Sequence, residues 1–130
     1  MPSYPHIFRV RQQFDARQVA DIPATVTAEL TRLNLGVAVK KGDTVAITAG
    51  SRGVANIAQI IGAAVAHFRA LGAEPYIVPA MGSHAGATAQ GQQAMLEGLG
   101  INAENIGAEI RSSMEVRKPK RRDAQLHDLH

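Results

Sequence analysis

Residues 44–79 constrain the fold more than any other part of the chain, because the spacing of apolar residues changes twice within them. Residues 44–48 (TVAIT) are a short, β-branched run, which is typical of a strand buried on both faces. A helical period follows over residues 56–71 and is expected to end at Gly72. Residues 74–79 are a second short apolar run. The pattern predicts a strand–helix–strand unit with two parallel strands and a right-handed crossover.

Each predicted strand is followed by a loop of small residues, 49–53 after the first strand and 80–87 after the second. Ligands of open parallel sheets bind outside the carboxyl ends of the strands, where both loops should lie. Arg52 and His84 are the ionisable residues of these loops. Because adjacent strands lie roughly 5 Å apart, we expect both side chains to face one solvent-accessible pocket.

The residue types in this predicted pocket indicate binding of an anion together with proton exchange. Arg52 offers a planar fork for a carboxylate or phosphate. His84 can donate or accept a proton near neutral pH. The alternative is that Arg52 pairs with a nearby acid and that His84 only shapes its loop.

The N-terminal part of the chain predicts one edge strand and one helix. Residues 7–14 alternate weakly, which suits an edge strand. Asp15 or Asp21 can cap a following helix, with Pro23 in its first turn. This helix is expected to be apolar on one side and to end near residues 34–36.

The C-terminal part predicts a further helix, a turn and a third strand. Thr88 can cap a helix that ends at Gly100 and buries Ala94, Met95 and Leu99. Residues 101–107 are expected to form one irregular helical turn, and residues 108–111 a short strand. The whole pattern predicts a small three-layer α/β domain, with a mainly parallel sheet and helices on both faces.

Composition and charge divide the chain into a domain, residues 1–116, and a basic tail, residues 117–130, for which we expect disorder. The formal net charge of +3 lies entirely in this tail, which has no aromatic residue, so we expect no nucleic-acid partner. No run approaches the roughly 20 apolar residues of a membrane span, and no signal peptide is recognised, which favours the cytoplasm.

Several chemical motifs are absent from the sequence or do not suit their setting. The chain has no cysteine, which excludes disulfides and thiolate metal sites, and it has neither classical glycine-rich phosphate loop. His127 and His130 are separated by two residues, but in a predicted tail we regard that pair as incidental. His67 is expected at the boundary of its helix's apolar face. We therefore expect no metal-ligating residues in this chain.

Three stretches, residues 48–57, 72–75 and 79–92, together resemble the N-terminal domain of the nickel-dependent lactate racemase family. The resemblance extends from about residue 7 to residue 116 and closes with residues 110–115 (IRSSME). It is closer to the racemase-like branch of the family than to lactate racemase itself.

The resemblance implies a two-domain enzyme that inverts a 2-hydroxy acid by reversible hydride transfer, with a nickel-pincer nucleotide held between the domains. His84 falls at the position of one of the family's two acid/base histidines. Ala49, Gly50, Ser51 and Arg52 fall on the loop that contacts the cofactor nucleotide. Lactate racemase has an aspartate at the position of Ala49, and this chain lacks that acid.

The family's second domain supplies the covalent cofactor lysine, the nickel-binding histidine and the second catalytic histidine, and nothing after residue 116 resembles it. We therefore expect a catalytic-domain fragment that is inactive alone and does not retain the cofactor. A surface meant to face the missing C-terminal domain would favour self-association. The alternative is a stand-alone α/β module that binds a carboxylate or nucleotide at Arg52 and His84.

Overall fold

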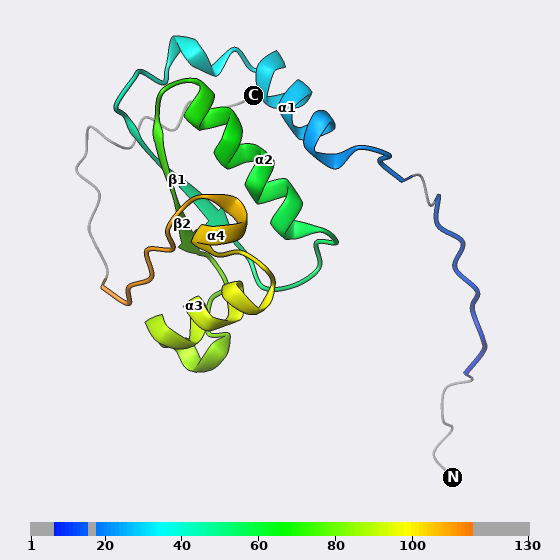
Figure 1. The fold of residues 1–130 in the computed structure, drawn as a ribbon. Helices are drawn as coiled ribbons and strands as arrows, with labels where there is room; N and C mark the ends of the chain where they lie inside the picture. The colour runs from blue at the N-terminus through cyan, green and yellow to red at the C-terminus, as the bar shows by residue number, and fades with distance from the viewer. Residues whose placement is uncertain (1–6, 16–17, 116–130) are drawn as a thin grey trace, which may run out of the picture.

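The structure, a computed structural model, describes residues 7–15 and 18–115 of the chain. At its centre are the two parallel strands β1 (Thr44–Ala49) and β2 (Glu74–Pro79), connected by helix α2 (Ile57–Ala70) (Figure 1). The strands pair in register, from Thr44 opposite Glu74 to Ala49 opposite Pro79. The predicted strand–helix–strand unit and the α/β class are therefore confirmed. The tail predicted for residues 117–130 lies outside the described residues.

The end of α2 shows why a glycine is needed there. Gly72 has φ +84°, and a Cβ atom at this position would lie 3.2 Å from Cγ of Lys41. The left-handed backbone turns the chain from the helix into β2, as the sequence predicts.

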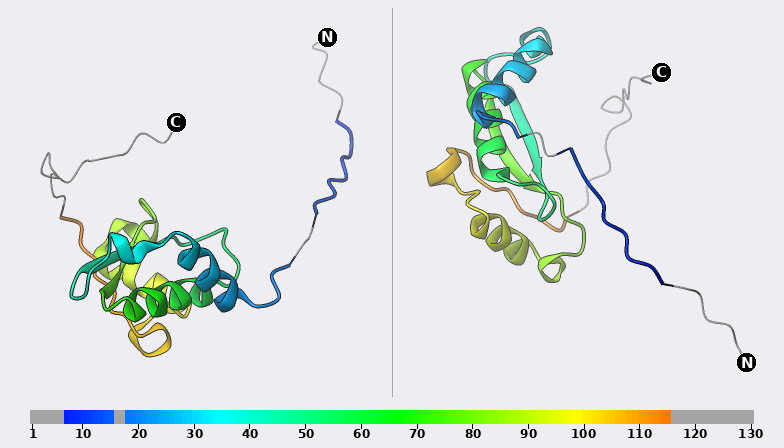
Figure 2. Two further views of the ribbon diagram at one scale, coloured as in Figure 1. Left: turned by 90° about the horizontal axis from the view of Figure 1, so that it is seen from above. Right: turned by 90° about the vertical axis from the view of Figure 1, so that its right-hand side faces the viewer.

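The sheet is covered mainly from one side. Along β1, Val45 and Ile47 are half-buried and Ala49 is buried, whereas the three residues that alternate with them are exposed. The expectation that this strand is buried on both faces is wrong. Figure 2 shows why: the helices gather on one side of the strands, so the predicted helical layer on the second face does not cover β1 within the described residues.

The hydrophobic core lies between the sheet and the helices on its covered side. Its largest fully buried side chains are Val65 of α2, Ile77 of β2, Leu96 of α3 (Ala89–Gly98) and Ile101. Each such side chain contributes about 1.5–3 kcal/mol by leaving water. The core therefore fixes α3 and the chain after it against the strand–helix–strand unit.

Helix α3 begins where the sequence predicts but buries another face. The Thr88 hydroxyl accepts a hydrogen bond from the N–H of Gly91 at 3.1 Å, which confirms the cap. Gln92 and Leu96 are the buried residues of the helix, whereas Ala94 is exposed and Met95 and Leu99 are 37% and 39% exposed. The predicted buried face is wrong because packing against β2 and the core decides which face of the helix is buried, and the helix's own sequence pattern does not show this packing.

The N-terminal part differs from its prediction. Helix α1 (Ile22–Arg32) is capped by Asp21, whose carboxylate accepts a hydrogen bond from the Ala24 N–H at 2.9 Å. The helix ends at Arg32, before the predicted end, and a 3₁₀ turn, η1 (Leu35–Val37), follows. Residues 7–15 form no strand, are exposed, and extend away from the body (Figures 1 and 2).

The C-terminal part of the described chain is closer to the prediction. The expected helical turn is α4 (Ala103–Ile106), which ends at Gly107. The third strand is reduced to a single parallel bridge between Ile110 and Ile77. Among the described residues, none of the helices is both long and apolar enough to cross a membrane.

Candidate functional site

The loops after β1 and β2 lie at the same edge of the sheet. The Ala80 N–H donates a 2.8 Å hydrogen bond to the Ala49 carbonyl, so the pairing of the strands continues to their last residues. A Cβ atom on Gly50 would lie 3.8 Å from the Ala80 carbonyl oxygen. The two loops therefore start side by side, as the parallel topology predicts.

The structure brings Ser51, Arg52 and His84 together at this edge. The imidazole of His84 lies between the other two side chains, with Nδ1 hydrogen-bonded to the Ser51 hydroxyl and Nε2 to the Arg52 guanidinium. Among the described residues, Arg52 thus contacts a histidine, whereas the alternative for it was a nearby acid. Ser51 and His84 are half-buried, and Arg52 is exposed.

The chemistry of these contacts assigns the proton on His84. A guanidinium has only donors, so Nε2 of His84 must accept its hydrogen bond through a lone pair. In the neutral ring the proton then lies on Nδ1, which donates to the Ser51 hydroxyl oxygen. Nε2 is therefore the basic atom of the site, and it points toward the cationic group that would attract an anion.

Helix α3 contacts the loop that carries His84 and stabilises it through a hydrogen bond. The side chain of Gln92 is only 4% exposed, and its amide nitrogen donates to the Gly82 carbonyl at 2.7 Å. Sequence reasoning missed this residue. The spacing of Gln92 and Leu96 by one helical turn was a usable signal, because it places both on the same side of α3.

The same loop has a strained backbone. It contains a 3₁₀ turn, η2 (Ala85–Ala87), in which the alanines at both ends have positive φ, 55° and 52°. Such conformations are uncommon for residues other than glycine, and their surroundings must hold them in place. One such neighbour is Gly91, where a Cβ atom would lie 2.2 Å from the Ala85 carbonyl oxygen. Only glycine fits there without moving the loop.

The remaining predicted site residues have distinct surroundings. Ala49 is 1% exposed and belongs to the core, so its methyl group cannot bind a ligand in this arrangement. Gly50 is half-buried at the start of the loop. His67 is half-buried and lies edge-on to Phe68, which agrees with its prediction as a boundary residue.

The sequence predicts a pocket at the site that Arg52 and His84 share. Three cavities of about 370 to 490 Å³ in the described residues are lined by residues other than Arg52 and His84, so none of these three is the predicted pocket. Arg52 and His84 instead lie at an open edge. The described ranges contain no group of three His, Cys, Asp or Glu side chains that could hold a metal ion. His127 and His130, whose spacing we regard as incidental, lie outside these ranges.

Comparisons of the chain with protein-family models, with curated proteins and with solved structures found no match.

Proposed function

We propose that this chain is the N-terminal catalytic-domain fragment of a racemase or epimerase that acts on a small 2-hydroxy acid. The observation that carries the proposal is the contact of His84 with both Ser51 and Arg52 at the carboxyl ends of two parallel strands. The resemblance to nickel-dependent lactate racemases supports the same reading. The cytoplasm is the compartment we propose for it.

The arrangement suits recognition of the two functional groups of a 2-hydroxy acid. Arg52 is exposed, so its guanidinium can form two parallel hydrogen bonds with a substrate carboxylate. When the carboxylate occupies the guanidinium, Nε2 of His84 is released to accept a hydrogen bond from the neighbouring hydroxyl. Transfer of the hydroxyl proton to Nε2 gives an imidazolium, whose Nδ1 proton remains hydrogen-bonded to Ser51.

The nickel-pincer nucleotide implied by the resemblance does not fit the described residues by themselves. Ser51, which falls on the loop that contacts the cofactor nucleotide, is hydrogen-bonded to His84, and Ala49 places a buried methyl group where lactate racemase has an acid. The roles of this chain are therefore anion binding and proton exchange at His84. Hydride transfer, and with it inversion, would depend on groups from a second domain.

The second candidate is a stand-alone module that binds a carboxylate or nucleotide. The observation that favours it is the open loop after β1. Gly53 has φ +84° and is exposed, and a Cβ atom added there would meet no atom within 4 Å beyond those of its chain neighbours, so this part of the loop is open to a ligand.

A titration of the whole chain separates these candidates. The probes are L-lactate, D-lactate, propionate (which lacks the hydroxyl) and AMP, with binding followed by NMR shifts of the loop residues. We expect both lactates to bind more tightly than propionate, and His84→Ala to abolish that difference. Arg52→Ala should weaken all carboxylates by roughly 10-fold or more, because a hydrogen bond to a charged group contributes about 1.5–3 kcal/mol.

The control is Arg32→Ala, which removes an exposed arginine of α1 that pairs with Glu29. It should leave every affinity unchanged. Equal binding of lactate and propionate by the unaltered chain would contradict a role for His84 in hydroxyl recognition. Binding of AMP without binding of lactate would favour the stand-alone module.

A further inference from the structure

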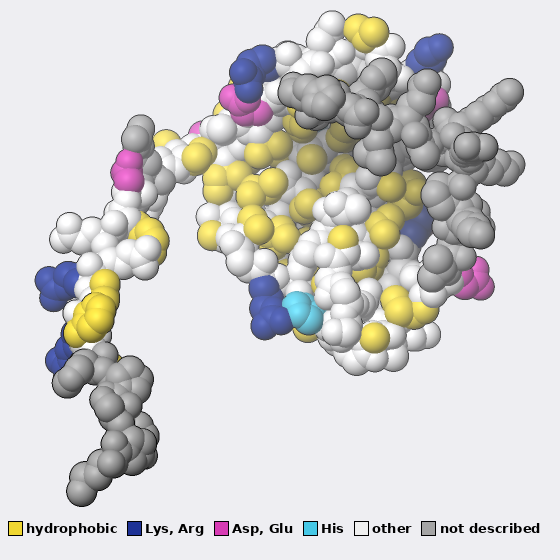
Figure 3. Space-filling view, turned by 180° about the vertical axis from the view of Figure 1, so that it is seen from behind, with side chains coloured by type: hydrophobic (Ala, Val, Ile, Leu, Met, Phe, Trp, Pro, Cys, Tyr) yellow, Lys and Arg dark blue, Asp and Glu magenta, His cyan; other side chains and the backbone are white. Residues whose placement is uncertain are grey.

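The N-terminal arm, defined as residues 7–14, exposes more apolar surface than a free chain segment needs. The side chains of Ile7, Phe8, Val10 and Phe14 are 97%, 80%, 76% and 75% exposed. No hydrogen bond or ion pair connects the arm to the rest of the described residues. Figure 3 shows it as an extended segment that carries apolar and basic side chains outside the body. An exposed apolar concentration of this kind marks an interaction surface.

The arm has the alternation of a strand with two different faces. One side carries Phe8, Val10, Gln12 and Phe14 and is mainly apolar; the other carries Ile7, Arg9, Arg11 and Gln13 and is mainly polar. The segment is thus suited to a position at a sheet edge, with one side against apolar groups and the other in water. In the described chain it occupies no such position.

The body of the same chain has a sheet edge without a partner. Within the described residues β1 pairs with β2 alone, so the outer edge of β1 presents free backbone donors and acceptors. On the side that faces the helices, Val45 and Ile47 are only half-buried. Open edges of this kind accept an additional strand through main-chain hydrogen bonds.

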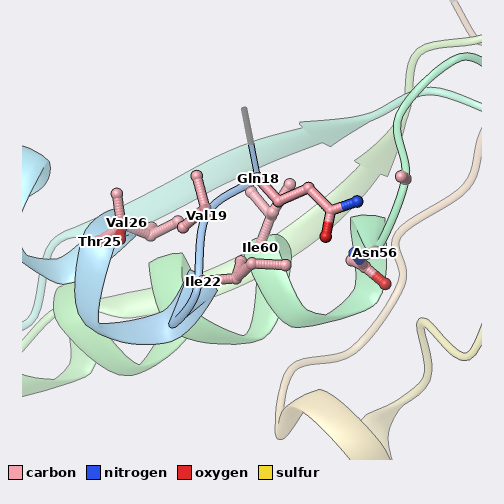
Figure 4. Close-up of a pocket in the computed structure, with 8 residues that line it drawn as sticks. Gln18, Val19, Ile22, Thr25, Val26, Asn56 and Ile60 are labelled. Carbon is pink, nitrogen blue, oxygen red and sulfur yellow. The ribbon is translucent and has the colours of Figure 1, made fainter. Parts of the chain in front are cut away.

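The helical layer near this strand is also incompletely packed. Helix α1 contacts α2 but has no buried residue among the described ones. A groove of about 490 Å³ lies between the start of α1 and the start of α2. Figure 4 shows the apolar side chains of Val19, Ile22, Val26 and Ile60 around it. These side chains line the walls of the groove, and no described side chain fills the space between them.

The area that the arm can bury favours a second copy of the chain as the source of the strand. Burying two phenylalanines and a valine removes roughly 400–500 Å² of arm surface, since an aromatic side chain buries about 150–250 Å². With a similar area on the receiving edge, and two such contacts in a symmetric pair, the total is roughly 1,600–2,000 Å², the size of a stable interface. A single arm that folds back on its own body would reach half of this.

We propose that two copies of this chain exchange their N-terminal arms, each arm adding a strand to the free edge of β1 in the other copy. Phe8, Val10 and Phe14 then face the helical layer and its groove. Arg9 and Arg11 lie on the open face of the sheet, which carries the acid Glu74 and the hydroxyls of β1. The exchange is reciprocal and closes with two-fold symmetry. It does not depend on the proposed enzymatic role.

Sedimentation equilibrium of the full chain and of two arm variants tests the association. We expect the unaltered chain to be a dimer. Val10→Asp, which places a charge on the apolar side of the arm, should raise the dissociation constant at least 10-fold. The matched control, Gln13→Asp, adds the same charge on the polar side and should leave the dimer intact. A monomeric unaltered chain at high concentration, or equal effects of the two substitutions, would overturn the proposal.

Disulfide trapping locates the arm, since the chain contains no cysteine of its own. Arg11→Cys and Ala46→Cys introduce thiols on the exposed side of the arm and of β1. On mild oxidation of an equal mixture of the two single variants, we expect a mixed disulfide between copies, identified by mass spectrometry of the linked peptides. In the chain carrying both substitutions, the linked peptides should again come from a covalent dimer. A disulfide formed within one monomeric chain would show that the arm docks on its own body, which would overturn arm exchange.

Discussion

The hydrogen bond from the Gln92 side chain to the Gly82 carbonyl allows a direct test of what stabilises the His84 loop. Gln92→Leu keeps the size of the buried side chain but removes the donor to the Gly82 carbonyl. A neutral hydrogen bond contributes about 0.5–1.5 kcal/mol, and a carbonyl left without its partner adds to the loss. We therefore expect the free energy of unfolding to fall by about 1–2 kcal/mol. For a domain of this size, that lowers the melting temperature by roughly 5–15 °C.

Thermal unfolding followed by circular dichroism measures this change, and amide hydrogen exchange at residues 82–84 shows whether it is local. The control is Gln93→Leu, since Gln93 is the exposed neighbour whose side chain donates to Glu97 at 2.9 Å, on the surface of the same helix. This substitution should change the stability by less than about 0.5 kcal/mol. If the two variants melt at the same temperature and exchange equally, Gln92 does not hold the loop.

Three further predictions concern the backbone, a helix cap and activity. Gly91→Ala should lower the free energy of unfolding in urea by more than about 2 kcal/mol, because the added Cβ atom would overlap the Ala85 carbonyl. Unchanged stability would mean that the loop moves to accommodate the methyl group. Asp21→Ala should lower the stability by about 1 kcal/mol through loss of the α1 cap, because the Asp21 carboxylate accepts the hydrogen bond of the Ala24 N–H; an unchanged midpoint of urea unfolding would contradict this. The purified chain should not interconvert D- and L-lactate, even with nickel-pincer nucleotide supplied, and measurable turnover in a chiral assay would disprove this.

The local features of the fold could be predicted from the sequence because neighbouring residues decide them. The change of period over residues 44–79 identifies two strands and a helix, and parallel pairing follows from the crossover between them. Asp21 and Thr88 cap helices because their side chains reach backbone N–H groups three residues away. The placement of Arg52 and His84 at one edge follows from the same topology, since parallel strands end together.

Features that depend on distant contacts required the tertiary structure. The pattern of α3 indicates Met95 and Leu99 as buried, but packing against β2 and the core turns Gln92 and Leu96 inward instead. The alternation of residues 7–14 is that of a strand, yet a strand forms only where an edge accepts its hydrogen bonds. The tautomer of His84 is likewise decided by groups 32 and 33 residues away in the chain. Such contacts form only when distant parts of the chain fold against one another. Short-range periodicity does not show which surfaces meet, so these contacts could not be predicted from it.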